Sequence, residues 1–462
     1  MTRMCLVTVL FGLLCAGAQG AAGGETLWSA GYAQADITPA PGQAQMCGFG
    51  RERYAQGTLA PLLTQVVALR DRNGATGVLI AADIVHFDRV MVEAIRRTVE
   101  HKHGLPPESV MLAASHTHWG PAVRFRMGLS LGAPNVWYMG VLEDKILGCV
   151  DAALANLAPA TIEYGWMDFR EIGCNRRRPQ DGRITWGPYE EGSFDGHTPI
   201  LRLRRSSKPQ QLLLVGHACH PTSSGPIQKW SPDYPGAMRD YLTDKLPGTR
   251  TVFVQGCGGD AKIVHRDDTT GKLVFANDPQ RAKAAGEKLG QAVLAHLETA
   301  EMTALDGPLN CALADGQLSY GPRWSQEEIE KLAYPEPGKS GQRRTWLMWA
   351  ARQALALPDR SESFRYEVQL WQLGDKLTVF AMEGEICSPW GPVLRAMAAT
   401  KQAMVIGYAN STGSYIPDSR IVREGGYECL TSQRAYSLPA PFTEKIDAEI
   451  DQIVKRAIAA LN

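Results

Sequence analysis

The sequence predicts an α/β fold of the mixed α+β type, in a single large domain with mixed sheets and flanking helices from about Glu25 to Asn462. Three observations lead to this prediction. Apolar runs of strand length alternate along the chain with segments of helical spacing. A strand, a helix and a second strand follow one another between residues 77 and 115, as in a βαβ unit. The composition, 44% hydrophobic and 21% charged, is that of an ordinary globular protein.

The first elements follow from these patterns. Segments 64–69 and 77–82 are apolar runs that predict strands. Segment 89–103 carries apolar residues at helical spacing and ends at the Gly-Leu-Pro of 104–106, which stops a helix. Segment 110–115 is the next buried strand.

The later elements are predicted in the same way. We expect a helix at 141–157, strands at 199–204, 211–216 and 251–255, and a long Ala-rich helix at 279–303. After these we expect a helical insertion at 325–363, a hairpin at 368–382 around Gly374 and Asp375, and a closing amphipathic helix at 443–461.

The N-terminus predicts an exported protein. Arg3 precedes the apolar run Met4–Leu14 and the small residues 16–18, so we expect residues 1–20 to be a secretory signal peptide. The apolar run is shorter than the roughly 20 residues of a membrane span, and no later segment is long and apolar enough to be one. We therefore expect a secreted or periplasmic protein without a transmembrane segment in the mature chain. Lys+Arg and Asp+Glu are both 48, so the net charge gives no indication of nucleic-acid binding.

Two histidines stand where a predicted strand ends. The segment VMLAASHTHWGP places His116 and His118 directly after an apolar run. In an extended chain, residues i and i+2 point to the same side. The two imidazoles can therefore bind one metal ion, or one can bind the metal while the other handles a proton. A pair of hydrogen-bonded loop histidines is the alternative, and spacing alone does not decide between these interpretations.

Two further strand ends carry similar side chains. In LLLVGHACHPTSSGP an apolar strand is followed by His217 and His220, and in VFAMEGEICSPWGP another strand delivers Glu383 and Glu385. Neutral histidine and carboxylate together form a usual catalytic zinc set, which has three protein ligands and one position open for water. None of these segments has the cysteine spacing of a structural zinc site. The residues therefore favour a zinc site at strand ends.

Ten short motifs run in order through most of the mature chain: AGYAQADITPAPG, MCGFGRERYAQGTLAPL, ASHTHWGP, CNRRRP, HACHPT, SPDYPGA, QGCGGD, EGEI, STGSYIPD and GGYE. In this order they resemble the neutral/alkaline (non-lysosomal) ceramidase family, specifically its catalytic N-terminal domain, which has HTHSGP where this chain has HTHWGP. The resemblance implies a neutral-ceramidase-like zinc hydrolase domain over residues 25–462. It also implies an amidohydrolase that cleaves an N-acyl substrate with zinc-activated water.

The resemblance also implies a ligand set when it is carried over position by position. The zinc ligands would be His116, His220, Glu385 and Tyr415. His220 is selected over His217 because it directly precedes the small-residue turn.

The remaining site residues come from the same resemblance. His118 and Tyr427 would face the scissile carbonyl, where both could donate to the developing oxyanion, and His118 or a water chain to it could protonate the leaving amine. Arg176 would line the substrate site. Asp260 is expected either to orient an imidazole from behind or to cap the loop after Gly258 and Gly259.

The chain departs from the family at one position in the site. The ceramidases carry Val-Ser-Pro-Asn after their Gly-Asp, with the serine at the active centre, whereas the matching stretch here is GGDAKIV. Lys262 therefore stands at the serine position, where we expect either a salt bridge to Asp260 or Asp233 or a substrate with a negative or strongly polar group. The ceramidases also have a C-terminal immunoglobulin-like domain, which we expect to be missing because no strand-rich tail precedes Asn462.

Three functions remain open on these grounds. The first is a secreted zinc amidase acting on an N-acyl lipid, including ceramide. The second is a zinc hydrolase of the same fold that acts on a polar or carbohydrate-type amide or ester, which Lys262 favours over a strict ceramidase. The third is a non-catalytic binding protein that keeps the zinc site. The third is disfavoured because His118 and Tyr427 accompany the ligand set, and a binding protein needs neither.

Overall fold

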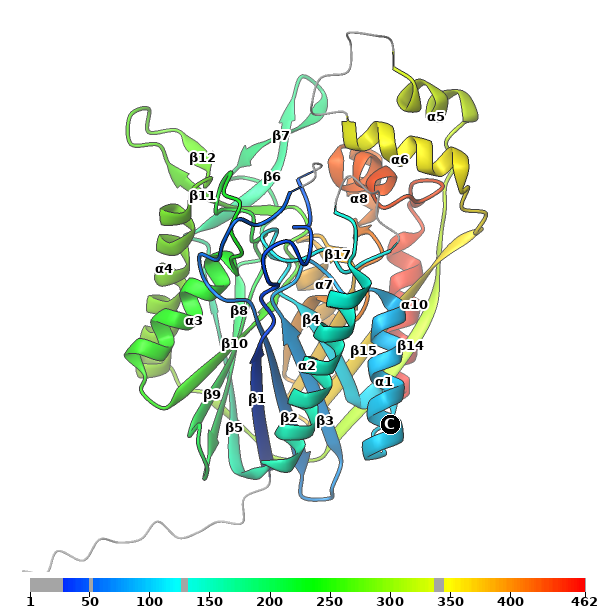
Figure 1. Cartoon of the computed structure of the whole chain (residues 1–462). Coiled ribbons are helices and arrows are strands. Elements are labelled where there is room, and N and C mark those ends of the chain that lie inside the picture. Colours follow the sequence, from blue (N-terminus) through cyan, green and yellow to red (C-terminus); the bar gives the residue numbers. More distant parts are fainter. Residues whose placement is uncertain (1–27, 50–52, 126–131, 336–344, 462) are drawn as a thin grey trace, which may run out of the picture.

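The computed structural model describes residues 28–49, 53–125, 132–335 and 345–461. The expected signal peptide, residues 1–20, lies outside this range. Within it the fold class is as predicted, a mixed α/β arrangement in which helices flank one large mixed sheet (Figure 1).

Thirteen strands of the described chain form the large sheet. In spatial order, twelve of them are β10 (Thr249–Gln255), β9 (Gln211–His217), β8 (His197–Arg205), β5 (Ala158–Asp168), β1 (Trp28–Asp36), β2 (Leu63–Asp71), β3 (Thr76–Ala82), β4 (Val110–Ala114), β18 (Gln402–Ala409), β16 (Leu377–Glu383), β15 (Ser363–Leu373) and β14 (Leu309–Ser319), with β13 (Thr303–Leu305) beside β5. The neighbours β9 and β10, β3 and β4, and β16 and β18 are parallel, and the other pairs are antiparallel.

The predicted βαβ unit is present. The strands β3 and β4 pair in parallel, and α1 (Arg89–His103) connects them, followed by the 3₁₀ turn η1 (Pro107–Ser109). Asp88 caps the start of α1 by accepting from the backbone N–H of Val90, and Gly104 ends it with a positive φ of 68°. The predicted hairpin around Gly374 is the antiparallel pair of β15 and β16.

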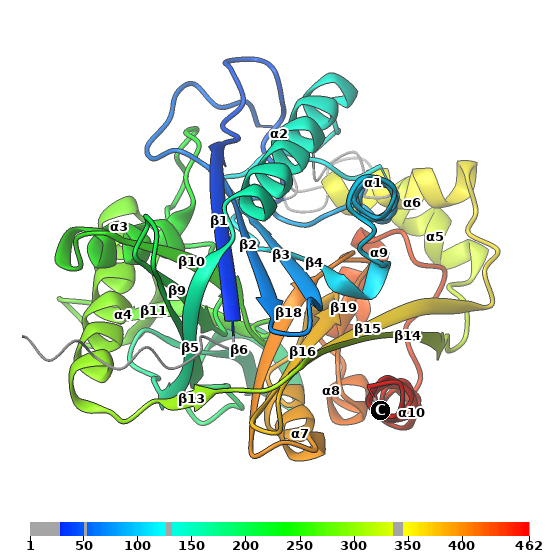
Figure 2. The same ribbon diagram turned by 90° about the horizontal axis from the view of Figure 1, so that it is seen from below.

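The strands of the sheet bury both of their faces. In β3, Val78 and Ile80 belong to a core that includes α1 and α2 (Val136–Ala155), whereas Leu79 and Ala81 face a second core shared with β9, β10, β16 and β18. The sheet therefore folds back on itself around an inner core. Seen from below, the helices lie around its outside (Figure 2).

Two other groups of helices cover the remaining outer faces. The helices α3 (Asp233–Lys245) and α4 (Pro279–Thr299) pack on β8, β9 and β10, and α7 (Trp390–Met397) and α10 (Ile446–Ala459) pack on β14, β15, β16 and β18. The predicted insertion contains α5 (Gln326–Ala333) and α6 (Thr345–Ala356), with residues 336–344 outside the described range.

Two small sheets and a helical segment complete the fold near the strand ends. One sheet has the order β12 (Leu273–Phe275), β11 (Ala261–Arg266), β6 (Gly173–Gln180) and β7 (Arg183–Tyr189), and the other pairs β17 (Glu385–Ile386) with β19 (Tyr415–Ile416). The segment after β19 contains α8 (Ser419–Glu424), the π-helix η4 (Tyr427–Thr431) and α9 (Ser432–Ala435).

Several predicted boundaries are wrong. The helix predicted at 141–157 begins at Val136 because Asn135 caps it, accepting from the N–H of Tyr138. The helix predicted to reach residue 303 ends at Thr299, because Thr303–Leu305 pairs with β5 as an edge strand. The closing helix spans 446–459 rather than 443–461. No helix within the described part of the chain has the length and apolarity needed to span a membrane.

Candidate functional site

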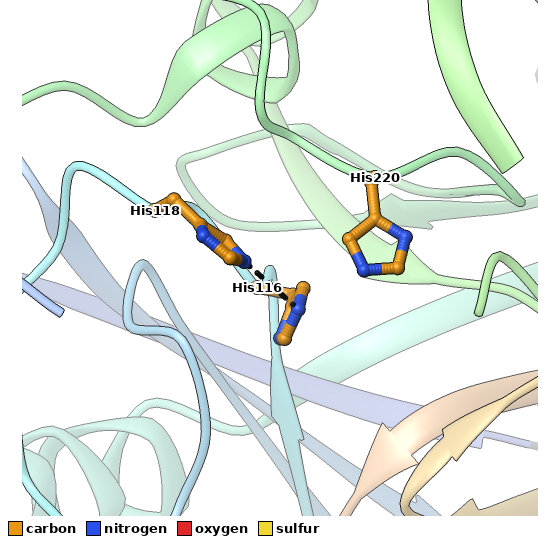
Figure 3. A group of neighbouring side chains, drawn as sticks. All are labelled: His116, His118 and His220. Atoms are coloured by element: carbon orange, nitrogen blue, oxygen red, sulfur yellow. Dashed lines mark hydrogen bonds between the residues drawn. The ribbon is translucent and has the colours of Figure 1, made fainter. Parts of the chain in front are cut away.

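Three histidines from two strand ends meet in one place. The ligand atoms of His116, His118 and His220 all lie within 4.8 Å of one another (Figure 3). His116 follows β4 by two residues, and His220 follows β9 by three. His116 has a positive φ of 67°, an uncommon conformation for a residue with a side chain and one that tends to occur at functional sites. The imidazole pair of the HTH motif is thus bent into the site rather than extended.

Backbone carbonyls hold two of these imidazoles. Nδ1 of His116 lies 2.7 Å from the carbonyl oxygen of Val85. Nδ1 of His220 lies 2.6 Å from the carbonyl oxygen of Gly258. A carbonyl only accepts, so each Nδ1 carries the hydrogen, and each Nε2 presents a lone pair to the centre.

A carboxylate faces those lone pairs. Oε2 of Glu385 lies 2.9 Å from Nε2 of His220 and 3.2 Å from Nε2 of His116. Oε1 of the same carboxylate accepts from the hydroxyl of Tyr436. The Tyr415 hydroxyl lies 3.2 Å from Nε2 of His220. The pairing of β17 with β19 brings Glu385 and Tyr415 together, because the two residues are register partners.

This arrangement lacks positive charge at its centre. A neutral imidazole has one N–H, which His116 and His220 each use on a carbonyl. Two lone pairs and a carboxylate oxygen therefore face each other within hydrogen-bonding distance. Only a cation between them, a proton or a metal ion, makes the contacts favourable. The residues present thus fit a metal ion.

Electrostatics determine the protonation of His118, His220 and Glu385. Burial, followed by the charge of Arg176, lowers the pKa of His220 to about 3. Burial and the neighbouring His116 and His220 hold the pKa of His118 well below its usual range. Burial opposes ionisation of Glu385, yet His116 and His220 hold its pKa well below the usual range. At neutral pH the site therefore contains neutral imidazoles at positions 118 and 220 and an ionised carboxylate, which is the protonation state that binds a metal.

His217 lies apart from this group. It is fully buried, its Nδ1 lies 3.0 Å from Oγ1 of Thr198, and its ring packs edge-on against Phe169 and Tyr234. The structure therefore brings His220, and not His217, to the centre.

Arg176 and Tyr427 lie beside the centre. Arg176 donates from Nη2 to the Tyr415 hydroxyl at 3.0 Å and from Nε to Oε1 of Glu428 at 2.9 Å. The ring of Tyr427 lies 5.5 Å from that of Tyr415, centroid to centroid. The contacts place Arg176 behind Tyr415, where its charge supports the tyrosine hydroxyl.

Lys262 lies on β11 next to His220. The two residues form an isolated parallel bridge, and the ammonium donates to Oγ1 of Thr222 at 2.7 Å. Burial, followed by the charge of Arg176, lowers its pKa to about 8. The salt bridge expected with Asp260 or Asp233 is absent among the described residues, where the ammonium donates to Thr222 instead.

The expectation that Asp260 orients an imidazole is wrong. Its Oδ1 accepts from the N–H of Ser388 at 2.7 Å and from the Ser388 hydroxyl, and its Oδ2 accepts from Asn175 at 2.8 Å. These contacts tie the 258–260 loop to β6 and to the turn after β17. The backbone carbonyls of Val85 and Gly258 orient the imidazoles in place of this carboxylate. Sequence patterns cannot reveal a contact to a backbone group.

Three residues of the site were not predicted. They are Tyr436, which donates to Glu385, Glu428, which pairs with Arg176 and Arg177, and Trp186, whose ring lies 4.4 Å below the Arg176 guanidinium. Glu428 is the last residue of the GGYE motif, which could have singled it out. Trp186 has a weaker signal, because the Asp-Gly pair at 181–182 is a usual two-residue hairpin turn and marks the hairpin of β6 and β7.

No family model matches the chain. Among solved structures, neutral ceramidase from Pseudomonas aeruginosa superposes with a TM-score of 0.74 and 18% identity, covering 95% of this chain and 75% of that chain. A second structure, a ceramidase complexed with C2, gives a TM-score of 0.73 and 17% identity over the same shares. The chain has the neutral ceramidase fold. This confirms the fold implied by the ten motifs, and at such low identity it establishes the fold alone.

Proposed function

We propose that the protein is a zinc-dependent hydrolase of N-acyl amides, with His116, His220, Glu385 and Tyr415 as the zinc ligands. The observation that carries the proposal is the meeting of two imidazole lone pairs on one carboxylate oxygen, Oε2 of Glu385, in a fold shared with neutral ceramidase. Imidazole nitrogen and carboxylate oxygen suit zinc.

His118 is the other possible ligand, in place of Tyr415. Its Nε2 lies 3.2 Å from Nε2 of His116, but its Nδ1 is buried and has no hydrogen-bond partner among the described residues. Metal-binding histidines almost always donate their second N–H to an acceptor that fixes the ring. His116 and His220 have such an acceptor, whereas the described residues provide none for His118, so we assign His118 to the reacting groups and not to the metal.

The chemistry then divides among the residues. A zinc ion in such a site supplies Lewis acidity and activates water at neutral pH. His118, held neutral, can carry a proton between the water and the leaving amine through Nε2. The hydroxyl of Tyr427 can donate to the carbonyl oxygen as its charge develops. Arg176 keeps the Tyr415 hydroxyl in position by donating to it.

Exposed aromatic rings support an acyl substrate. Phe49 is 43% exposed and its ring lies 5.0 Å from that of His118. Trp186 is 49% exposed and its ring lies 5.3 Å from that of Tyr427. Both residues with a proposed proton or oxyanion role are thus flanked by apolar surface that an acyl chain can cover. The N-terminal leader pattern supports a secreted or periplasmic location.

The test combines metal analysis with a substrate panel. We expect purified wild-type protein to contain one zinc per chain and to hydrolyse long-chain N-acyl amides. Glu385→Ala should lose both properties, whereas Glu298→Ala, on the exposed face of α4, should keep both. Zinc retained without hydrolysis of any amide or ester would favour the binding protein, and the absence of zinc would contradict the ligand set.

A further inference from the structure

The small four-stranded sheet contributes one side chain from each strand to a single cluster. In strand order these are Phe275 on β12, Lys262 on β11, Arg176 on β6 and Trp186 on β7. The Lys262 ammonium lies 5.4 Å from the ring centroid of Phe275 and 6.0 Å from that of Trp186, and the Arg176 guanidinium lies 4.4 Å from the latter. Two cations thus lie beneath two aromatic rings beside the metal centre.

The two cations differ in how their charge is balanced. Arg176 is paired with Glu428, and its neighbour Arg177 is paired with Glu428 and Glu424. Lys262 is only 9% exposed, and its hydrogen bonds within the described chain go to the hydroxyl and the carbonyl oxygen of Thr222. These neutral oxygens leave the charge of the ammonium uncompensated.

Asp233 is the carboxylate whose charge acts on Lys262, but it does not compensate the ammonium by direct contact. Among the described residues the ammonium donates to Thr222 and forms no ion pair with Asp233. Oδ2 of Asp233 instead accepts from the N–H groups of Ser223 and Ser224 and from the Ser224 hydroxyl. A buried, unpaired ammonium is destabilising. Perturbed buried charges cluster at ligand-binding and catalytic sites.

We propose that Lys262, together with Thr222, binds a carboxylate of the substrate, so that the preferred amides are N-acyl amino acids rather than neutral N-acyl amines. This inference rests on the proposed amide hydrolysis. A single ammonium matches the single charge of a carboxylate, because phosphate recognition usually recruits several cationic or N–H donors.

The position of Lys262 indicates where the carboxylate belongs. Because Lys262 and His220 are bridge partners, their backbones run about 5 Å apart. The Lys262 ammonium also lies near the ring of Trp186, which packs on the Arg176 guanidinium that donates to Tyr415. A group bound by Lys262 is therefore close to the scissile amide. A carboxylate on the carbon attached to the amide nitrogen meets that requirement, whereas one at the far end of an acyl chain does not.

The experiment compares N-dodecanoylglycine with its neutral carboxamide, N-dodecanoylglycinamide. In the wild type we expect kcat/KM to favour the carboxylate, and in Lys262→Met we expect this preference to fall by about 10- to 100-fold, the range for a lost hydrogen bond to a charged group. Lys283→Met, an exposed lysine of α4, is the matched control and should keep the wild-type preference. Thr222→Val is a second variant and should lower the preference in the same direction.

Two further readouts separate this inference from a structural role and from the proposed function. Lys262→Met should melt at a higher temperature than the wild type, because it removes an uncompensated buried charge. N-dodecanoylglycine should raise the melting temperature of the wild type more than its carboxamide does, and this difference should vanish in Lys262→Met. An unchanged preference, or an equal loss on both amides, would overturn the inference. If the wild type cleaves neither amide, amide hydrolysis fails, and the ligand-induced melting shifts alone decide whether the carboxylate site exists.

Discussion

Replacing His118 by alanine separates metal binding from chemistry. The imidazole Nε2 of His118 lies 3.2 Å from Nε2 of His116, yet Nδ1 has no hydrogen-bond partner in the part of the chain that the structure describes. The carbonyl groups of Val85 and Gly258 accept from the other two imidazoles instead. Removing this ring leaves the contacts of Glu385 to His116 and His220 in place. His118→Ala should therefore retain one zinc per chain.

The magnitude of the rate loss follows from the proposed role. Loss of a positioned proton carrier reduces a rate by about 10²- to 10⁴-fold, and loss of one oxyanion donor by about 10²- to 10³-fold, equivalent to about 2.7–4 kcal/mol. We therefore expect kcat to fall at least about 10²-fold. The zinc content, measured by mass spectrometry on dialysed protein, and kcat on a saturating N-acyl amide should be determined on the same preparation.

A control shows whether the effect is specific. His101 is exposed near the C-terminal end of α1, and His101→Ala should leave zinc content and kcat unchanged. A His118→Ala protein that loses its zinc would make His118 a ligand in place of Tyr415. A protein that retains both zinc and full activity would remove His118 from the mechanism.

Three other predictions follow from single contacts. Tyr436→Phe removes the donor to Oε1 of Glu385 and should weaken zinc affinity by about 10- to 100-fold in a competition assay with a chelator; unchanged affinity would show that this hydrogen bond does not tune the ligand. Gly48 has a φ of 90°, and a Cβ there would collide with Nδ1 of His118, so Gly48→Ala should lower kcat without loss of zinc. Burial lowers the pKa of His217 to about 3, so the unfolded state binds more protons and the contribution of this histidine to stability is lost as the pH falls below about 6.5. From pH 7 to pH 5 the wild type should therefore lose about 2 kcal/mol more unfolding free energy in urea than His217→Leu, and equal losses would contradict the burial argument.

Local sequence could predict which site residues follow the ends of strands. The apolar runs before His116, His220 and Glu385 identify the strands, and the polar residues that follow each run must leave the core. His116 and Glu385 converge because β4 and β16 both pair with β18, so that Ala113 and Glu383 lie on either side of Ala409. His220 reaches them from β9, which shares the inner core with these strands. That convergence depends on how the whole sheet curves. The hydrophobic periodicity of the sequence identifies single strands but does not predict this curvature.

The site tyrosines, and the groups that hold the proposed ligands in position, were harder to predict. Tyr415 and Tyr427 have no local pattern that distinguishes them from core tyrosines, and only the resemblance to ceramidases singled them out. Tyr436 directly follows the short helix α9, far along the chain from Glu385, and the groups that orient His116 and His220 are backbone carbonyls. Every residue has a backbone carbonyl, so no residue type in the sequence marks the ones that accept from an imidazole. We therefore considered the side chain of Asp260 for this role.

The most direct test of the central claim is anomalous diffraction at the zinc edge from crystals of the wild-type protein. The ligand set predicts one strong peak within about 2.0–2.2 Å of Nε2 of His116, Nε2 of His220 and Oε2 of Glu385, with the Tyr415 hydroxyl also coordinated and His118 outside bonding distance. A peak that coordinates His118 in place of Tyr415 would contradict the ligand set, and the absence of any transition-metal peak between these side chains would contradict the zinc-hydrolase account as a whole.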